Sequence, residues 1–366
     1  MNPPLIGCTK ADLDTPALYV DLDAFEFNVR TMSEACRARG VDWRPHSKCH
    51  KSSAIARELV EAGAIGVTCA KLGEAEVMAG GGVTDLLIAN LIVGPHKVAR
   101  LVELRKIADP IVCIDHIDQA RPISDAMQAA GLRQRVILEV DIGLGRVGVA
   151  PGEATLTLAK QVVQLPGLHF AGIMGYEGHL LTLPDANEKR SQIHAALNIL
   201  RDMKQLLEQN DIACPIVSCG GSGSFYQSLD HDGITELQAG GAMFMDEFYR
   251  HQCQLAELRD ALFLIVTVVS RPTPERAIID AGRKTMNMEV AMPKVLGRDD
   301  IHIERLSAEH GQLRLEPSAQ DLRIGDRLEI VPGYGDLTTV LHDRFYGFRG
   351  DRLEKIWPLE ARGRLQ

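Results

Sequence analysis

The stretch from Arg44 to Lys51 (Arg-Pro-His-Ser-Lys-Cys-His-Lys) gathers basic and imidazole side chains at one point in the chain. Residues 43–46 predict a short strand, and residues 52–61 predict a helix with apolar residues along one side. Lys48 therefore lies where a strand gives way to a helix, which in a βα barrel is the end that carries the reactive groups. A lysine amine in these surroundings suits covalent binding of an aldehyde cofactor. The alternative is that Lys48 and Lys51 are solvated loop cations.

Two glycine clusters follow predicted strands further along the chain, at Gly220-Gly221-Ser222-Gly223-Ser224 and at Gly240-Gly241. Glycines allow the backbone to approach a phosphate closely, and Ser222 adds a hydroxyl donor. In βα barrels the loops after the seventh and eighth strands often form one phosphate site. The positions of the two clusters therefore favour phosphate binding, although either cluster alone is also typical of an ordinary loop.

Two further loops offer groups that could bind a ligand or move protons. Arg146 follows a predicted strand in a glycine-rich turn, where a guanidinium could hydrogen-bond a phenolate or a carboxylate; a surface ion pair is the alternative. Tyr176, Glu177 and His179 follow the next predicted strand, where the ring could stack and the other two groups could transfer protons. The sequence does not tell whether Glu177 or His179 points inward.

Strand-like and helix-like segments alternate regularly from Val41 to Gln238. Alternation of this length favours an α/β fold with a parallel (β/α)8 barrel over an open sheet. A doubly wound sheet is the alternative, but the glycine fingerprint of dinucleotide-binding folds is absent after the first strand. The expected strands are 43–48, 65–69, 85–90, 111–115, 136–141, 170–176, 215–219 and 235–238, and the expected helices are 52–61, 73–79, 95–105, 119–130, 152–164, 187–209 and 224–229.

The pattern changes near Asp260, after which strand-like runs are joined by Gly, Pro and Asp turns. We therefore predict a barrel domain over residues 22–250 and a β-rich second domain built from residues 1–21 plus 251–366. Asp336 and His342 in the second domain carry atoms that bind metals, but their spacing matches no simple metal template. The expected strands are 17–22, 262–269, 276–280, 301–307, 312–316, 326–331 and 344–348.

The composition is ordinary for a globular protein, with 45% hydrophobic and 24% charged residues. The formal charge of −9 argues against nucleic acid or an anionic membrane surface as a partner. Residues 1–4 show no basic leader, and the longest apolar run, residues 261–269, is too short to cross a bilayer. The eight cysteines include no Cys-x-x-Cys pair, which suits reduced thiols and a cytoplasmic location.

Taken together, these motifs resemble those of the fold-type III pyridoxal-phosphate enzymes, and within them the D-threonine aldolase and D-serine dehydratase group. The similarity runs over nearly the whole chain. The Arg-Pro-His-x-Lys-x-His-Lys motif at residues 44–51 is specific. The other matching segments are residues 14–17, 20–23, 141–148, 220–223, 236–240, 244–246, 280–282 and 357–363.

The resemblance implies an alanine-racemase-like barrel with a second β domain, and pyridoxal 5′-phosphate as the cofactor of the barrel. Lys48 would hold the cofactor's aldehyde covalently, Arg146 would approach its O3′ side, and Tyr176 would lie near its ring. His46 would help to line the pocket. A homodimer, in which each second domain lies by the partner's barrel, is also implied. The residues that would hold the phosphate are Gly221, Ser222, Gly223, Gly240 and Gly241.

One departure from the family concerns a metal. Relatives bind a divalent ion such as manganese, magnesium or zinc through a His-x-Cys or His-x-Asp pair, but the matching segment here is Tyr334-Gly335-Asp336. A neutral phenol is a poor ligand for a divalent ion near pH 7. The replacement of the family's histidine by Tyr334 argues against a metal centre. An ion could still be held by Asp336, with His342 as a substitute ligand. Gly241 and Ala242 also stand where relatives often carry Ser and Tyr.

The resemblance implies a lyase that cleaves D-3-hydroxy amino acids by a retro-aldol reaction into glycine, or another small amino acid, and an aldehyde. Without a metal, His179, Glu177 or Tyr334 must help to remove the hydroxyl proton. A dehydratase that releases a 2-oxo acid and ammonia is one alternative. A racemase is another, with Lys48 as one base and Tyr176 or Tyr334 as the second. A non-catalytic cofactor carrier is a third, and the second domain argues against it.

Overall fold

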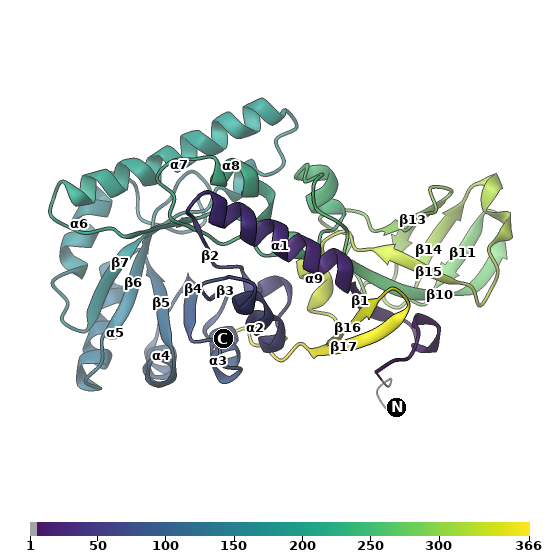
Figure 1. Cartoon of the computed structure of the whole chain (residues 1–366), viewed down its shortest axis with the longest axis horizontal. Helices are drawn as coiled ribbons and strands as arrows, with labels where there is room; N and C mark the ends of the chain where they lie inside the picture. Colours follow the sequence, from purple (N-terminus) through teal and green to yellow (C-terminus); the bar gives the residue numbers. More distant parts are fainter. Residues whose placement is uncertain (1–5) are drawn as a thin grey trace. The chain divides into compact units, whose positions relative to one another are not determined.

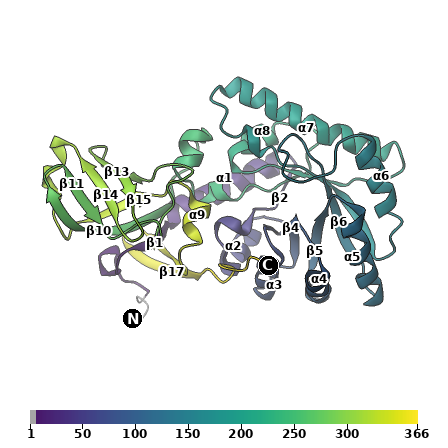
Figure 2. The same ribbon diagram turned by 180° about the vertical axis from the view of Figure 1, so that it is seen from behind.

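The computed structural model describes residues 6–366, so the expectation for residues 1–4 lies outside the described residues. Across the part that is described, no helix is long and apolar enough to cross a membrane. Figures 1 and 2 show the chain from opposite sides.

The chain divides into two compact units, and each is built from segments that are far apart in sequence. Of the described residues, the barrel unit holds 32–240 with 363–366, and the β-rich unit holds 6–31 with 241–362. The boundaries expected from the sequence, 21/22 and 250/251, stay a prediction; they differ from this division at residues 22–31 and 241–250.

The barrel unit is a parallel sheet of eight strands within the described residues, as the alternating sequence pattern predicts. The strands follow the order β2-β9-β8-β7-β6-β5-β4-β3. His46, just after β2, pairs with Thr68 of β3, so the two ends of this order meet and the sheet curls into a barrel. The strands are β2 (Asp42–Trp43), β3 (Val67–Cys69), β4 (Asp85–Leu91), β5 (Asp109–Ile114), β6 (Gln134–Glu139), β7 (Leu168–Met174), β8 (Ile216–Cys219) and β9 (Glu236–Leu237).

Helices follow the strands and lie against their outer face, and consecutive helices contact each other (Figure 1). The inner face holds a cluster of buried side chains from β4 to β7, among them Leu87, Ile111, Ile137 and Met174. The seven helices expected from the sequence are all present. They are α2 (Ser53–Glu61), α3 (Leu72–Gly80), α4 (Pro95–Ile107), α5 (Ile117–Ala129), α6 (Glu153–Val162), α7 (Ala186–Glu208) and α8 (Phe225–Leu229).

Buried charges tie the strands of the barrel together and fix strand β2. The Arg44 guanidinium is only 2% exposed and binds Glu236 on β9 (2.8 Å) and Asp85 on β4 (3.1 Å). Arg135 on β6 binds the same Asp85 carboxylate at 2.7 Å. For the fully buried Arg44–Glu236 pair, removing one partner typically costs about 3–5 kcal/mol, because the other charge is left without compensation. The network therefore anchors the strand that leads into Lys48.

The β-rich unit carries a mostly antiparallel sheet around a core of Leu13, Tyr19, Phe263, Phe348 and Leu353. This confirms the β-rich character expected from the sequence. Its strands are β1 (Ala17–Asp21), β10 (Leu262–Thr273), β11 (Arg276–Ile279), β12 (Lys294–Val295), β13 (Ile301–Leu306), β14 (Gly311–Leu315), β15 (Arg327–Val331), β16 (Arg344–Arg349) and β17 (Arg352–Pro358). Four elements were not expected: helix α1 (Leu22–Ala38), the short helix α9 (Gly335–Thr339), and strands β12 and β17.

Candidate functional site

Lys48 lies in a short 3-10 turn, η2 (Ser47–Cys49), which residues 44–46 separate from strand β2. The backbone N–H of Lys48 donates to Nδ1 of His46 at 3.3 Å, which fixes the start of the turn. The second lysine of the motif is committed elsewhere, because Lys51 Nζ donates to Oε1 of Glu74 at 3.0 Å in a buried ion pair. Of the two motif lysines, Lys48 is therefore the candidate for cofactor attachment.

Positive charges gather around the half-buried imidazole of His46. Burial lowers the pKa of His46 well below its ordinary value, and the nearby Lys48, Lys51, His50 and Arg146 lower it further. The His46 ring is therefore neutral at physiological pH and can accept hydrogen bonds. A local cluster of cations in a chain of formal charge −9 suits an anionic ligand.

Arg146 is presented by the turn that follows strand β6. Asp141 Oδ1 accepts hydrogen bonds from the N–H groups of Gly143 (2.9 Å) and Gly145 (3.0 Å) and so closes this turn. The Arg146 guanidinium binds Glu139 at 3.2 Å and lies 5.7 Å from the centre of the Tyr176 ring. Both candidates therefore come together at the carboxyl ends of neighbouring strands.

After strands β8 and β9, neighbouring atoms lie so close to the glycines that little or no room remains for a Cβ atom. A Cβ on Gly221 would lie 3.0 Å from the Tyr176 ring, and a Cβ on Gly240 would lie 2.5 Å from the His46 carbonyl oxygen. Ser222 is buried in the 3-10 turn η4 (Ser222–Ser224). This glycine-rich turn therefore packs directly against the tyrosine ring, and Gly240 packs against the strand that leads into Lys48.

Glu177 and His179 point to different places. The Glu177 side chain is buried, and its carboxyl accepts hydrogen bonds from the hydroxyls of Ser224 (2.5 Å) and Ser228 (2.9 Å). Burial raises the pKa of Glu177, while these hydroxyls act in the opposite direction. His179 is exposed, and a Cβ on Gly143 would lie 3.0 Å from its Nε2. The imidazole therefore lies beside the turn that presents Arg146, whereas the carboxyl lies beneath the glycine-rich turn.

The remaining candidates, Gly241, Tyr334 and Asp336, belong to the β-rich unit. A Cβ on Gly241 would lie 2.5 Å from the hydroxyl of Tyr249, so this position admits only glycine without rearrangement. The Tyr334 hydroxyl donates to Asp336 Oδ2 at 3.0 Å. The phenol and the carboxylate thus form one hydrogen-bonded pair.

The residues of the Tyr334–Asp336 segment do not fit a divalent metal. The Asp336 carboxylate accepts a hydrogen bond from a phenol, which is a poor metal ligand. His342 is half-buried with Nε2 2.8 Å from the carbonyl oxygen of Thr285, to which it donates. Among the residues that the structure describes, no group of three or more His, Cys, Asp or Glu side chains could hold a metal ion.

The residues of the barrel unit do fit pyridoxal 5′-phosphate. Lys48 offers an amine for the aldehyde, Arg146 offers a guanidinium for the phenolate, and Tyr176 offers a ring beside the pyridine. The glycine-rich turn, with the Ser222 hydroxyl, offers backbone and side-chain donors for a phosphate. Lys48, Lys51 and Arg146 bring positive charge close to His46, which suits a ligand with several negative charges.

Several residues that build the site were not singled out from the sequence. Glu74 is a lone buried acid on an apolar helix, and that pattern could have indicated a buried cationic partner. Ser224 belongs to the glycine-rich stretch, but nothing in the sequence links it or Ser228 to Glu177. Asp246 accepts a hydrogen bond from the N–H of Gly335 (2.7 Å), a contact between segments far apart in sequence.

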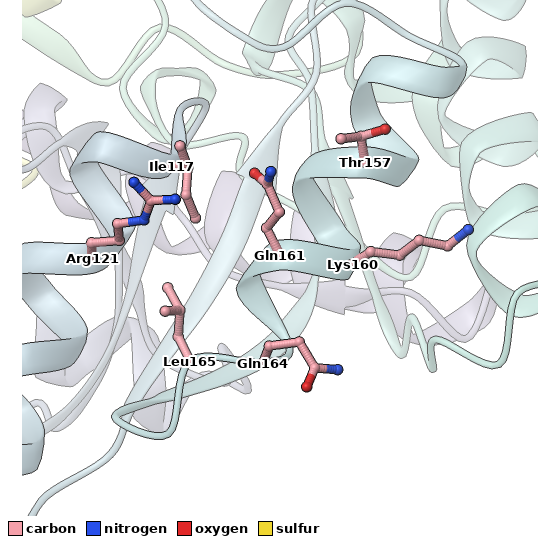
Figure 3. Close-up of a pocket in the computed structure, with 7 residues that line it drawn as sticks. All are labelled: Ile117, Arg121, Thr157, Lys160, Gln161, Gln164 and Leu165. Carbon is pink, nitrogen blue, oxygen red and sulfur yellow. The ribbon is translucent and has the colours of Figure 1, made fainter.

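A separate groove lies outside the barrel, between helices α5 and α6 (Figure 3). Its volume is about 410 Å³, and Arg121 and Lys160 rise from the two helices that form it. None of the candidate site residues lines it, so it is not part of the candidate site.

Two family models match the chain. The model of the alanine racemase N-terminal domain matches residues 20–247, and the model of a putative serine dehydratase domain matches residues 261–348. The two matches together span most of both units.

Named relatives match nearly the whole chain. A 3-hydroxy-D-aspartate aldolase of Paracoccus denitrificans is 35% identical, covering 99% of this chain and 95% of the relative. A D-threonine aldolase of an Arthrobacter species is 37% identical, covering 98% and 95%. The crystal structure of D-threonine aldolase from Filomicrobium marinum matches with a TM-score of 0.97 at 38% identity and covers 100% of both chains.

Proposed function

The chain belongs to the alanine racemase N-terminal domain family of pyridoxal-phosphate enzymes, and we propose that it is a lyase acting on D-3-hydroxy amino acids. The reaction is retro-aldol cleavage of the Cα–Cβ bond, which releases glycine, or another small amino acid, and an aldehyde. The observation that carries this proposal is the near-complete match to relatives named as aldolases, at 35% and 37% identity.

Residues of the barrel unit, with Gly241 of the β-rich unit, are proposed to bind the cofactor. Lys48 attaches it, Arg146 neutralises its phenolate, and the turn at Gly221, Ser222 and Gly223, with Gly240 and Gly241, holds its phosphate. His46 and Tyr176 line the pocket. When bound, the cofactor accepts the electron pair of the bond that breaks at Cα.

His179 is proposed to accept the proton of the substrate's β-hydroxyl. Its imidazole is exposed beside the turn that presents Arg146, so a substrate at that turn could reach it. Histidine is the side chain whose ordinary pKa best suits proton transfer near neutral pH.

Tyr334 is proposed as a second proton carrier. Its hydroxyl donates to the Asp336 carboxylate. The carboxylate can therefore accept the phenol proton while the phenol oxygen takes a proton from the substrate's hydroxyl group. This pair would replace the metal of metal-using relatives in assisting the hydroxyl group.

A dehydratase is the second candidate, because the β-rich unit matches the putative serine dehydratase domain over residues 261–348. A dehydratase must expel the β-hydroxyl as water, and this requires strong acid assistance. The Tyr334–Asp336 pair offers less assistance than a bound metal ion, so cleavage is the preferred assignment.

A panel of D-3-hydroxy amino acids tests the proposal, with every reaction run with manganese, with a chelator and with neither. We expect glycine and an aldehyde in equal amounts, at rates that the chelator does not change. Ammonia with a 2-oxo acid would identify a dehydratase, and exchange of enantiomers would identify a racemase. Activity that requires manganese would overturn the assignment of proton transfer to Tyr334.

The assembly and location are also proposed. The resemblance supports a homodimer. A molar mass of twice the chain mass, measured by light scattering, would support this assembly. The scattered cysteines and the charge of −9 support a cytoplasmic enzyme with neither nucleic acid nor membrane partners.

A further inference from the structure

A buried carboxyl lies beneath the glycine-rich turn of the barrel unit. Glu177 follows Tyr176 at the end of strand β7, and none of its surface is exposed. A Cβ on Gly220, the first residue of the turn, would lie only 3.6 Å from Glu177 Oε1. The carboxyl therefore faces the inner side of the turn and not the mouth of the barrel.

Two serine hydroxyls bind this carboxyl, Ser224 from the turn itself and Ser228 from helix α8, which follows the turn. Ser224 and Ser228 both donate to Glu177 Oε1, at 2.5 and 2.9 Å. The Ser224 oxygen also accepts a hydrogen bond from the backbone N–H of Gly221 at 3.3 Å. A chain of contacts thus runs from Glu177 through Ser224 to the backbone of the turn.

The neighbouring residue supports the same turn from another side. The Tyr176 ring packs on Gly221, where a Cβ would lie 3.0 Å from the ring. Consecutive residues of one strand end therefore fix the turn, Tyr176 through its ring and Glu177 through hydrogen bonds.

The stability of the folded protein alone does not explain why a carboxyl, that of Glu177, is buried beneath the glycine-rich turn. Burial disfavours its charged form, and its second oxygen, Oε2, is buried with no hydrogen-bond partner among the described residues. Buried polar atoms that lack a partner are uncommon in folded proteins and call for a specific explanation.

We propose that Glu177 is a positioning residue that holds the Gly220–Ser224 turn, through Ser224 and Ser228, in the shape that binds the cofactor's phosphate. This inference rests on the proposed cofactor and replaces the role of Glu177 in proton transfer that the sequence left open. Glu177 contributes to cofactor affinity without touching the cofactor's reacting atoms.

The test compares two ligands of the apo-protein, pyridoxal 5′-phosphate and pyridoxal, by spectral titration. Glu177→Leu fills the space but removes the acceptor, so we expect affinity for pyridoxal 5′-phosphate to fall about tenfold or more. Affinity for pyridoxal, which has no phosphate, should not change. Glu177→Gln keeps one oxygen for both serine hydroxyls and should retain most of the wild-type preference.

A matched control is available in the same barrel. Glu236, on strand β9, is also a buried acid that accepts a hydrogen bond from a serine, Ser218, at 2.7 Å, but its charge is paired with Arg44. Glu236→Gln should lower thermal stability and leave the ratio of the two affinities unchanged.

Equal losses for both ligands in Glu177→Leu, or no loss for either, would overturn the inference. If that variant does not fold, Ser224→Ala and Ser228→Ala carry the same test, because each removes one link to the carboxyl. Failure of the wild-type protein to bind either ligand would instead overturn the proposed cofactor, so the two failures can be told apart.

Discussion

At the scale of single residues, burial decides which groups of the motif at residues 44–51 can react. Lys51 is neutralised by Glu74, His50 is buried, and the pKa of the half-buried His46 is held well below its ordinary value. Lys48 is half-buried in the 3-10 turn η2. The motif therefore combines one reactive amine with neighbours that position it and shape the charge around it.

His50 gives the first prediction, on pH and stability. Burial and the nearby Lys51 lower the pKa of His50 to about 3, whereas a histidine in the unfolded chain titrates at about 6.5. Between these values the unfolded chain binds a proton that the folded protein does not. Stability is therefore lost as pH falls, by about 2 kcal/mol for this group between pH 7 and pH 5.

Urea unfolding of wild-type protein and of His50→Asn at pH 7 and pH 5 measures this contribution. Asparagine can replace His50 Nδ1 as the acceptor for the Ser52 N–H, which lies 3.1 Å away. The variant should lose about 2 kcal/mol less than the wild type over this range. Equal losses in the two proteins would contradict a buried neutral imidazole.

At the scale of elements, much of the site could be expected from the sequence. The strand and helix alternation placed every candidate of the barrel unit at the carboxyl end of a strand, because barrel strands run parallel. The orientation of Glu177 could not be read, since it depends on Ser224 and Ser228, which reach it only in the folded barrel.

Helix α1, which was not expected, has an apolar pattern in its sequence that could have predicted it. Its buried apolar residues Leu22, Phe25, Val29, Met32 and Cys36 recur at helical spacing. That periodicity is typical of an amphipathic helix. The short helix α9 has no comparable pattern, and its start is held by a contact with Asp246 from a distant segment.

The packing of Gly240 against strand β2 gives a prediction for these elements. A Cβ there would meet the His46 backbone, with its oxygen at 2.5 Å and its nitrogen at 2.7 Å. Gly240→Ala should therefore push the strand that leads into Lys48, lower the free energy of unfolding by about 1–3 kcal/mol and weaken cofactor binding.

Gly80, at the end of helix α3, is the matched control. A Cβ there would meet nothing within 4 Å, so Gly80→Ala should stabilise the protein by about 0.5–1 kcal/mol and leave the cofactor affinity unchanged. Chemical unfolding and cofactor titration of both variants measure the effects. Equal changes in unfolding free energy and in cofactor affinity in the two alanine variants would refute a specific contact at Gly240.

At the scale of the whole molecule, one of the two proposed proton carriers lies in a different unit from the groups around the cofactor. The groups proposed to attach and surround the cofactor, Lys48, His46, Arg146 and Tyr176, belong to the barrel unit, while Tyr334 and Asp336 belong to the β-rich unit. Cofactor binding and proton transfer by Tyr334 should therefore respond to different substitutions.

Tyr334→Phe tests this division. The variant removes the hydroxyl that donates to Asp336, so we expect turnover of a D-3-hydroxy amino acid to fall by about a hundredfold. The dissociation constant for pyridoxal 5′-phosphate should remain that of the wild type. Normal turnover in this variant, or a parallel loss of cofactor affinity, would contradict the proposed role.

The identity of the lysine that attaches the cofactor is the central claim. Borohydride reduction of cofactor-loaded protein, followed by peptide mapping, fixes the label on the nitrogen that carries the cofactor. We expect the label on Lys48 and none on Lys51, whose ammonium is bound to Glu74. A label on Lys51 or on any other lysine, or no label at all in loaded protein, would contradict it.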